Sequence, residues 1–268
     1  MTERPVRTSW VALPLLFCYT YVMNELKHLD EFQSLLSDYQ LSKQALQTLS
    51  QTRLVLLVAP TSSGRNRLIR ELLKTDDYYY IVSDTTRQPR TNDGVIEQSG
   101  VEYWFREESE VLDDIRDGKY LEAAVIHQQQ VSGISVRELK LATDKGKIAI
   151  TDAEIAGIDN AIRLKPDTLG IFVLPPSFDE WQRRLHHRGD MHHEEYKRRM
   201  ESAVAEFQAA LEHDYYRFVI NDDISSAVQQ INGIAKLDAY SAEQHSVGRH
   251  LAEQLLLETS ILLRSFES

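Results

Sequence analysis

The chain has 268 residues, 42% of them hydrophobic, and a formal net charge of −11. This length allows one large α/β domain with appendages or two small domains, and the composition argues against a disordered chain. The acidic charge argues against general affinity for nucleic acid or anionic membranes, so neither partner is expected. The single cysteine, Cys18, excludes an internal disulfide framework and favours a reducing, cytoplasmic location.

Residues 1–22 differ in composition from the rest of the chain. Arg4 and Arg7 precede an apolar run from about Trp10 to Val22, which is short for a transmembrane helix. Three interpretations stay open: a signal peptide or anchor, an extension upstream of a natural start at Met23, and a packed N-terminal segment. The second is favoured, because no small-x-small cleavage motif follows the run.

Residues 23–50 are expected to form a helical extension ahead of the main domain. From Asn24 to Leu49, apolar residues recur at helical spacing, with a break expected near Ser37–Leu41. The pattern predicts one or two helices that lean on the main domain, as structural packing or as a dimer contact.

A phosphate-binding loop is predicted within residues 54–73, LVLLVAPTSSGRNRLIRELL. An apolar run from Leu54 to Val58 leads into a turn of small polar residues, and helical spacing resumes after Gly64. The N–H groups of such a turn and the N-terminus of the following helix would face an anion. The residues expected to bind donor phosphates are Pro60, Thr61, Ser62, Ser63, Gly64, Arg65 and Asn66.

This loop departs from the standard G-x-x-x-x-G-K-[ST] pattern. Ala59 stands where the pattern has its first glycine, Arg65 where it has lysine, and Asn66 where it has serine or threonine. The scaffold is therefore retained while the chemistry of the loop is altered.

Strands alternate with helices through the rest of the main domain. Strands are expected at 78–83, 101–105, 120–127, 147–151, 169–174 and 217–220, with a polar loop at 85–94 and a Gln-rich turn after 127. Helices are expected at 107–117, 136–145, 155–164, 178–187, 194–213 and 224–237. This alternation predicts βαβ units and a mostly parallel sheet flanked by helices.

Residues 233–268 are expected to form a C-terminal helical extension. In the last helix, about 242–266, an apolar stripe is expected to pack on the N-terminal helices or on a second copy of the chain: Val247, Leu251, Leu255, Leu262 and Phe266. A homodimer through the terminal helices is one of these two arrangements.

Polar residues follow several predicted strands, where open α/β sheets bind ligands. Asp152 follows the strand KIAIT, a position from which a carboxylate reaches a magnesium ion at a phosphate loop. Arg87 and Arg90 lie in a Pro-containing loop, and two guanidinium groups at this spacing can hold a phosphate by bidentate hydrogen bonds.

Residues 183–199, RRLHHRGDMHHEEYKRR, place several arginines around a Gly-containing turn. Such a segment suits a mobile lid that brings positive charge over transferring phosphates. The alternative is an exposed helical hairpin of mixed charge.

Together these segments resemble the guanylate kinase family, from about Arg53 to Ile231. The most specific stretch is VSDTTRQPR (82–90), which is similar to the family's VS-x-TTR-x-PR, followed by GVEYWF (100–105). Further matches are YLEAA (120–124), KIAITDAEIAG (147–157), FVLPPS (172–177), RRLHHRG (183–189) and VINDD (219–223). The resemblance implies a P-loop NTPase-type domain at 51–232, with an acceptor-binding subdomain at about 83–135 and a lid at about 183–199.

The resemblance also implies a site for a nucleoside monophosphate. Ser83 and Glu122 match the positions that address guanine, and Arg87, Arg90 and Tyr103 match those that hold its phosphate. Asp152 and Glu154 match an acidic pair near metal and base, with Glu154 replacing an aspartate.

On the donor side, Asn221 matches an asparagine near the donor nucleotide. Asn66 and Asp152 are the implied magnesium ligands. The implied catalytic residues are Arg65 in the loop and Arg184, Arg188 and Arg199 in the lid.

Two departures from the family concern function. The HGNYYGTS region reads HQQQVSGIS (127–135), so a second phosphate-binding tyrosine is missing near Val131 or Ser132. In the donor loop, Ala59 and Ser62 replace glycines and crowd a turn that must wrap phosphates closely. Because phosphoryl transfer depends on positioning and electrostatics, these changes could slow it severely.

Three functions are compatible with this sequence. The first is a kinase that transfers the γ-phosphoryl group of ATP to GMP with Mg²⁺, weakened by the altered loop. The second is a degenerate relative that binds a nucleotide or a phosphorylated partner without catalysis. The third is a kinase of the same fold with another acceptor, such as a phosphorylated sugar. Ser83 and Glu122 favour a guanine-type acceptor, and the retained lid arginines, Asp152 and Asn221 favour the first function.

Overall fold

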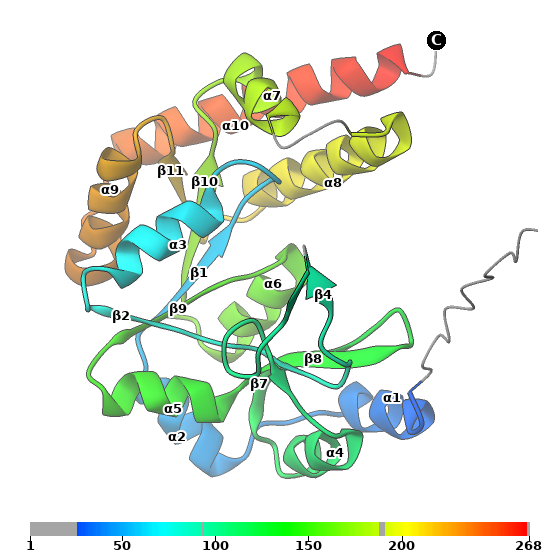
Figure 1. Cartoon of the computed structure of the whole chain (residues 1–268). Helices are drawn as coiled ribbons and strands as arrows, with labels where there is room; N and C mark the ends of the chain where they lie inside the picture. Colours follow the sequence, from blue (N-terminus) through cyan, green and yellow to red (C-terminus); the bar gives the residue numbers. More distant parts are fainter. Residues whose placement is uncertain (1–25, 93, 188–190, 267–268) are drawn as a thin grey trace, which may run out of the picture.

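The computed structural model describes residues 26–92, 94–187 and 191–266. Residues 1–22, for which three interpretations are open, lie outside these ranges. The predicted lid residue Arg188 also lies outside them. Within the described chain, helices cover both faces of a central sheet, and a smaller sheet lies beside it (Figure 1).

The central sheet of the described residues has five strands, all parallel. Their spatial order is β11 (Tyr216–Ile220), β10 (Leu169–Leu174), β1 (Leu54–Val58), β9 (Ile148–Asp152) and β2 (Tyr78–Tyr80). The predicted parallel sheet is therefore confirmed.

Strand β1 is buried on both faces because the sheet is covered on both sides. Val55 and Leu57 pack toward α3 (Arg65–Leu73) and α9 (Ile224–Leu237). Leu54, Leu56 and Val58 face the opposite cluster, as the two-residue period of a strand requires. That cluster includes side chains of α5 (Val136–Asp144), α6 (Ile155–Leu164), α7 (Phe178–His186), α8 (His193–Glu212) and α10 (Ala242–Ser265).

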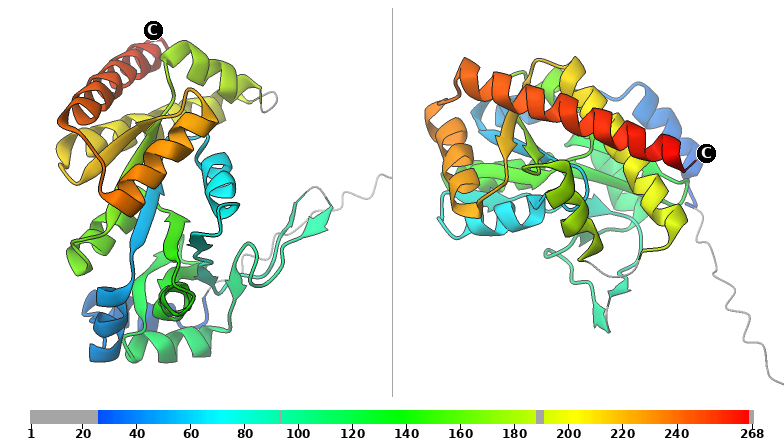
Figure 2. Two further views of the ribbon diagram at one scale, coloured as in Figure 1. Left: turned by 90° about the vertical axis from the view of Figure 1, so that its left-hand side faces the viewer. Right: turned by 90° about the horizontal axis from the view of Figure 1, so that it is seen from above.

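The second sheet is mixed, in the order β6 (Trp104–Phe105), β3 (Asp84–Thr85), β8 (Gln130–Ser135) and β7 (Tyr120–Ile126). Helices α1 (Leu29–Ser37) and α4 (Glu108–Arg116) pack against it in a separate apolar cluster around Phe32 and Tyr120. A short hairpin of β4 (Thr91–Asn92) and β5 (Val95–Ile96) extends from this part of the molecule (Figure 2).

A strand that the sequence did not predict, β8, follows the Gln-rich turn predicted after residue 127. Strand β8 begins at Gln130 and pairs antiparallel with both β7 and β3, which satisfies its backbone groups. The turn itself is tight, with positive φ at His127 and Gln128. The strand predicted at 101–105 is reduced to β6, and the predicted loop at 85–94 carries part of β3 and all of β4.

The N-terminal extension has two helices, with the break close to the predicted position. Helix α1 contacts α4 and β7 beside the second sheet, whereas α2 (Lys43–Gln51) packs on α5. The extension therefore touches the second sheet as well as the main domain.

The C-terminal helix α10 packs along α8 and β11, at the opposite end of the molecule from α1 and α2 (Figure 1). Leu255 is buried in this contact, and Phe266 meets the rings of His193 and Tyr196 at the start of α8. The expectation that the stripe of this helix packs on the N-terminal helices is wrong. Within the described ranges, no helix is long and apolar enough to cross a membrane.

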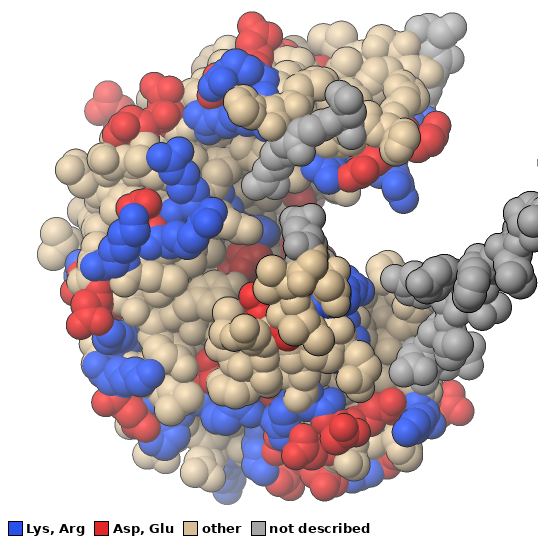
Figure 3. Space-filling view, viewed as in Figure 1, with Lys and Arg blue, Asp and Glu red and all other residues tan. Residues whose placement is uncertain are grey.

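The carboxyl ends of the five parallel strands meet at one edge of the central sheet. In the space-filling view a deep notch separates the part that carries α7 and α8 from the part that carries β4, β7 and β8 (Figure 3). Ligands of open α/β sheets bind at such an edge, so the site is expected there.

Candidate functional site

The loop that joins β1 to α3 has the backbone shape of an anion-binding turn. Gly64 has φ +97°, and a Cβ there would lie 2.1 Å from Asn221 Nδ2, so no side chain fits. Ser62 has φ +65°, a conformation that an L-residue adopts only against strain. The loop therefore has glycine at a position where no side chain fits, and its Ser62 carries backbone strain.

Two side chains from distant elements fix this loop. The indole Nε1 of buried Trp181 in α7 donates to the carbonyl oxygen of Thr61 at 2.8 Å. Asn221, which follows β11, donates from Nδ2 to the carbonyl oxygen of Ser63 at 2.7 Å. Asn221 is one of the residues predicted from sequence, whereas Trp181 was missed because its ring looked like ordinary core.

The loop surrounds a cavity of about 130 Å³ at the N-terminus of α3. The hydroxyl groups of Ser62 and Ser63 are buried and have no hydrogen-bond partner among the described residues. Buried polar groups without partners are rare in folded proteins. The orphaned hydroxyls and the helix N-terminus fit a phosphate group in this cavity.

Arg65, the cation of the loop, is directed at the end of the neighbouring strand β9. Its Nη2 lies 2.9 Å from Asp152 Oδ2, and its Nη1 donates to the carbonyl oxygen of Ala153 at 3.4 Å. The hydroxyl of Tyr80 donates to the other carboxylate oxygen of Asp152 at 3.1 Å. The predicted metal ligand Asp152 is thus engaged by Arg65, while Asn66 is exposed at the start of α3.

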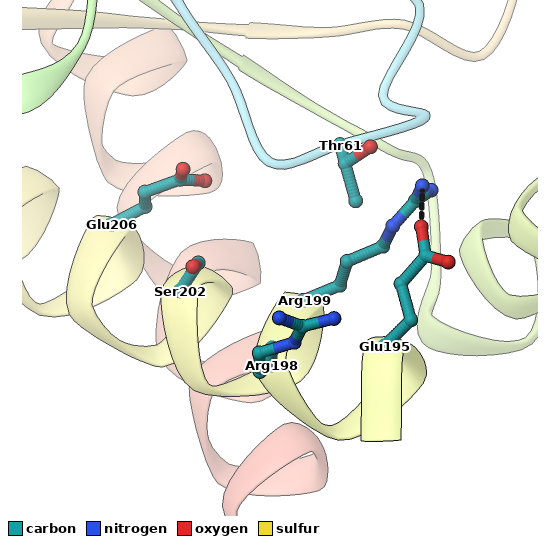
Figure 4. Close-up of a pocket in the computed structure, with 6 residues that line it drawn as sticks. All are labelled: Thr61, Glu195, Arg198, Arg199, Ser202 and Glu206. Atoms are coloured by element: carbon teal, nitrogen blue, oxygen red, sulfur yellow. Dashed lines mark hydrogen bonds and ion pairs between the residues drawn. The ribbon is translucent and has the colours of Figure 1, made fainter. Parts of the chain in front are cut away.

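The predicted lid residues lie on two helices that flank the loop. Arg184 on α7 donates to Glu180 Oε1 at 2.7 Å and to the carbonyl oxygen of Asn221 at 2.9 Å. Arg199 on α8 pairs with Glu195 and lines a cavity of about 350 Å³ beside Thr61 (Figure 4). The structure therefore brings these two arginines to the donor loop.

Glu206 is a further residue of this cavity that sequence reasoning missed. It lies on α8, and its Oε2 is enclosed and accepts no hydrogen bond from the described residues. Burial raises the pKa of Glu206 to about 7, a shift that Arg65 opposes and Glu154 reinforces.

This pKa shift predicts a stability effect of Glu206→Gln. A carboxyl whose folded pKa is raised stabilises the native state below its ordinary pKa near 4.5 and loses that contribution as pH rises through about 7. At pH 8 the variant is therefore expected to be about 2–3 kcal/mol more stable than wild type. At pH 4.5 the two proteins should be equally stable. Urea denaturation at both pH values measures this, with exposed Glu201→Gln as the control, and equal stabilities at pH 8 would contradict the burial of a charge.

On the acceptor side, Arg87 is held by a bidentate ion pair with Glu97. Its Nη2 donates to Glu97 Oε1 at 3.0 Å and its Nη1 to Glu97 Oε2 at 2.5 Å. Its guanidinium carbon lies 4.8 Å from the ring centre of Tyr103. Glu97 also accepts from the backbone N–H of Arg90 at 2.8 Å, whereas the Arg90 side chain is exposed. The pKa of Glu97 falls to about 2, chiefly because of its hydrogen bonds with Arg87.

The two residues implied for guanine lie at the junction of the two sheets. Glu122 on β7 packs against Gly157 of α6, where an added Cβ would lie 2.6 Å from its Oε2. Burial raises the pKa of Glu122, and the nearby carboxylate of Glu154 adds to this. Half-buried Ser83 accepts a hydrogen bond at its carbonyl oxygen from Trp104 N at 2.9 Å. A half-buried carboxyl and a half-buried serine suit the polar edge of a base.

The two positions where the resemblance leads us to expect a second phosphate-binding tyrosine make other contacts. Val131 is buried in the core of the second sheet, and Ser132 Oγ is 2.9 Å from Thr85 Oγ1. Neither side chain supplies a phenol hydroxyl there.

Fold and site together define an α/β protein of the P-loop NTPase class. The guanylate kinase family model matches residues 51–237, and the chain belongs to the guanylate kinase family.

Individual relatives agree with this family. The chain is 35% identical to guanylate kinase from Nostoc sp. over 181 residues, which cover 67% of this chain and 87% of that one. It is 32% identical to guanylate kinase 1 from Oryza sativa subsp. japonica over 187 residues, but spans only 48% of that longer protein. The crystal structure of guanylate kinase from Anaplasma phagocytophilum shares the fold with a TM-score of 0.50 at 22% identity, covering 71% of this chain and 88% of that one.

Proposed function

We propose that the protein transfers the γ-phosphoryl group of ATP to GMP. The observation that carries this proposal is the guanylate kinase family match over residues 51–237, which includes both the donor loop and the strands assigned to the acceptor. An ion pair of 2.9 Å joins Arg65 of the donor loop to Asp152 at the carboxyl end of β9. Glu154 raises the pKa of both Glu122 and Glu206, which supports a site whose donor and acceptor residues lie near one another.

In this reaction an oxygen of the GMP phosphate attacks the γ-phosphorus of ATP, and the bond to the β-phosphate oxygen breaks to release ADP. The chain's contribution is positioning and positive charge. The loop at 60–66 holds the donor phosphates, and Arg65, Arg184 and Arg199 stabilise the charge on the transferring group. Arg87, Arg90 and Tyr103 hold the acceptor phosphate in line.

Magnesium fits this site as an ion that arrives with the nucleotide. The described residues contain no cluster of three or more acidic, histidine or cysteine side chains that could hold a metal. Magnesium keeps several waters and usually takes one or two protein ligands beside phosphates, so Asn66 and Asp152 suffice. Asn66 and Asp152 would hold the ion, which would supply positive charge beside the transferring phosphates.

A second candidate function, nucleotide binding without catalysis, is favoured by one feature of the loop. Arg65 is engaged by Asp152, and Ser62 is strained, so the donor phosphates must rearrange the loop before transfer. Turnover with ATP, Mg²⁺ and a panel of GMP, AMP, CMP and UMP separates the two functions. Of the four acceptors, GMP should be the one that is phosphorylated, at a rate that the altered loop keeps low. Binding of GMP without turnover of any acceptor would favour the second function.

The assignment of Arg87 to the acceptor phosphate gives a testable prediction. Arg87→Ala is expected to weaken GMP binding by about 1.5–3 kcal/mol, since a hydrogen bond to a charged group is lost. Guanosine, which has no phosphate, should lose little affinity. Calorimetric titration of both ligands measures this, with Arg116→Ala on exposed α4 as the control. Equal losses for GMP and guanosine would show that Arg87 does not bind the phosphate.

A further inference from the structure

A second cavity, of about 670 Å³, lies between α2, the end of α4 and the first half of α5. Helices α2 and α5 are in contact and lie side by side in Figure 1. Among the described residues that line this cavity, none is assigned to the donor or to the acceptor. Its volume falls within the range of about 300–1,000 Å³ that pockets for small molecules occupy.

Basic side chains outnumber acidic ones in this cavity, in a chain whose net charge is −11. Four of the described lining residues are cationic: Arg106, Lys119, Arg137 and Lys140. Two carboxylates, Asp114 and Asp117, also line the cavity, and both pair with Lys119. Lys140 pairs with exposed Asp144 on its own helix. The lining residues therefore carry two more positive charges than negative ones, which favours an anionic ligand.

The two arginines of the cavity are held in place by a buried carboxylate outside it. Asp84 accepts from Arg106 Nη1 at 3.1 Å and from Arg137 Nη2 at 2.6 Å. The guanidinium carbon of Arg137 also lies 5.4 Å from the ring centre of Trp104. Asp84 neutralises part of the charge, but it also fixes the direction of both guanidinium groups. Because a guanidinium has five N–H donors, Arg137 can donate to a further acceptor while it stays on Asp84.

Ser135 supplies the observation that points to a ligand. It is the N-cap residue of α5, it lines the cavity, and it is 3% exposed. Its hydroxyl does not cap the helix, and its Oγ has no hydrogen-bond partner among the described residues. The first N–H groups of a helix lack intrahelical partners and attract anions. A buried hydroxyl at this uncapped N-terminus therefore calls for an acceptor that binds from the cavity.

The acidic residue in the first turn of α5, Glu138, is engaged on the side of the sheet. It is fully buried, and its Oε1 accepts from Trp104 Nε1 at 3.0 Å while its Oε2 accepts from Val82 N at 3.2 Å. Its Oε1 also lies 3.8 Å from Arg137 Nε. Glu138 does not appear among the described residues that line the cavity, so its carboxylate leaves the N-terminus of α5 open to an anion there.

We propose that the N-terminus of α5 binds the phosphate group of a small phosphate ester that occupies this cavity. The Ser135 hydroxyl and the backbone N–H groups of Arg137 and Glu138 donate to the phosphate oxygens. The Arg137 guanidinium and Lys140, which line the same cavity, neutralise the phosphate charge. The rest of the ester lies against α2. This site is separate from the proposed kinase site and does not depend on it.

Amide NMR spectra of labelled protein, titrated with inorganic phosphate at pH 7, test this site separately from the donor loop. The N–H signals of Arg137 and Glu138 report on α5, and that of Arg65 reports on the donor loop. In wild type the α5 signals should shift and saturate, whereas potassium chloride at equal ionic strength should leave them unchanged. A second titration uses ribose 5-phosphate, a phosphate ester. It should saturate the same signals at an equal or lower concentration, because the cavity has room for more than one phosphate group.

The decisive variant is Ser135→Ala. It should raise the concentration for half saturation of the α5 signals about tenfold, as expected when a hydrogen bond to a charged group is lost. Because the hydroxyl has no partner among the described residues, the variant should melt at the wild-type temperature or above it. Lys140→Gln, a change at an exposed position, should raise the same concentration about threefold. Ser241→Ala, which removes the N-cap residue of α10, is the matched control and should leave the titration unchanged.

The outcomes are specific to this site. No saturable shift of the α5 signals in wild type, or equal half saturation in wild type, Ser135→Ala and Lys140→Gln, would overturn the proposal. Saturation by inorganic phosphate without saturation by ribose 5-phosphate would overturn the assignment to a phosphate ester. A weakened response at α5 in both variants, with the Arg65 signal responding as in wild type, supports the inference. Failure of the proposed kinase activity would leave these results unaffected.

Discussion

Arg65→Ala is expected to reduce turnover of ATP with GMP by about 10²–10³-fold, the loss seen when one fixed donor to transition-state charge is removed. Arg67 and Arg70 also line the cavity of the loop, but both are exposed, whereas Arg65 is half-buried. Arg65 is also the loop residue that the structure joins to β9. Its removal should therefore affect transfer more than it affects binding of GMP.

Two controls accompany this measurement. Lys74→Ala, at the far end of α3, should leave turnover unchanged, and Arg65→Lys should retain most of it because the charge survives. A steady-state assay with saturating ATP and GMP gives the values. Arg65→Ala protein that keeps a tenth or more of wild-type turnover would contradict a role for this guanidinium in transfer.

The largest effect on stability is expected from Asp84→Ala. Asp84 is 1% exposed, and its carboxylate accepts from Arg106 Nη1 at 3.1 Å, Arg137 Nη2 at 2.6 Å and the Tyr120 hydroxyl at 2.6 Å. The change leaves the cations without their central partner, which typically lowers the free energy of unfolding by about 3–5 kcal/mol. Because Asp84 begins β3, between Ser83 and Arg87 in the chain, GMP affinity should fall as well.

Urea denaturation at pH 7 measures this loss. Asp117→Ala is a suitable control, since Asp117 is 60% exposed and forms only a surface pair with Lys119. A loss below about 1 kcal/mol for Asp84→Ala would mean that the network does not stabilise the second sheet.

Local sequence signals predicted the strand, turn and helix that carry the predicted donor loop. The apolar run of β1, the small residues of the turn and the helical spacing after Gly64 all arise from neighbouring residues, and the structure has the same elements. The polar residues at the ends of the strands also predicted that the site lies at the carboxyl edge of the sheet. By contrast, β8 depends on pairing with β3, a strand 45 or more residues away, and its Gln-rich start resembles a turn.

The residues that the sequence did not reveal act through long-range contacts. Glu97 reaches Arg87 because the β4–β5 hairpin folds back, and nothing in its neighbours marks it as buried. Glu206 is one of several glutamates on α8, and periodicity alone would place it on a solvated face. Only the packing of α8 beside the loop shows that it is enclosed.

The most direct test of the account is GDP formation by wild-type protein and by the loop variant with both Arg65→Lys and Asn66→Ser, at saturating ATP, magnesium and GMP. We expect wild type to form GDP at a measurable rate, because Arg65 keeps a cation at the position of the usual lysine. The loop variant should match or exceed this rate, because it restores the standard lysine and serine of the loop. No GDP from wild type, with or without rescue by the loop variant, would contradict the proposal that this chain is itself a kinase.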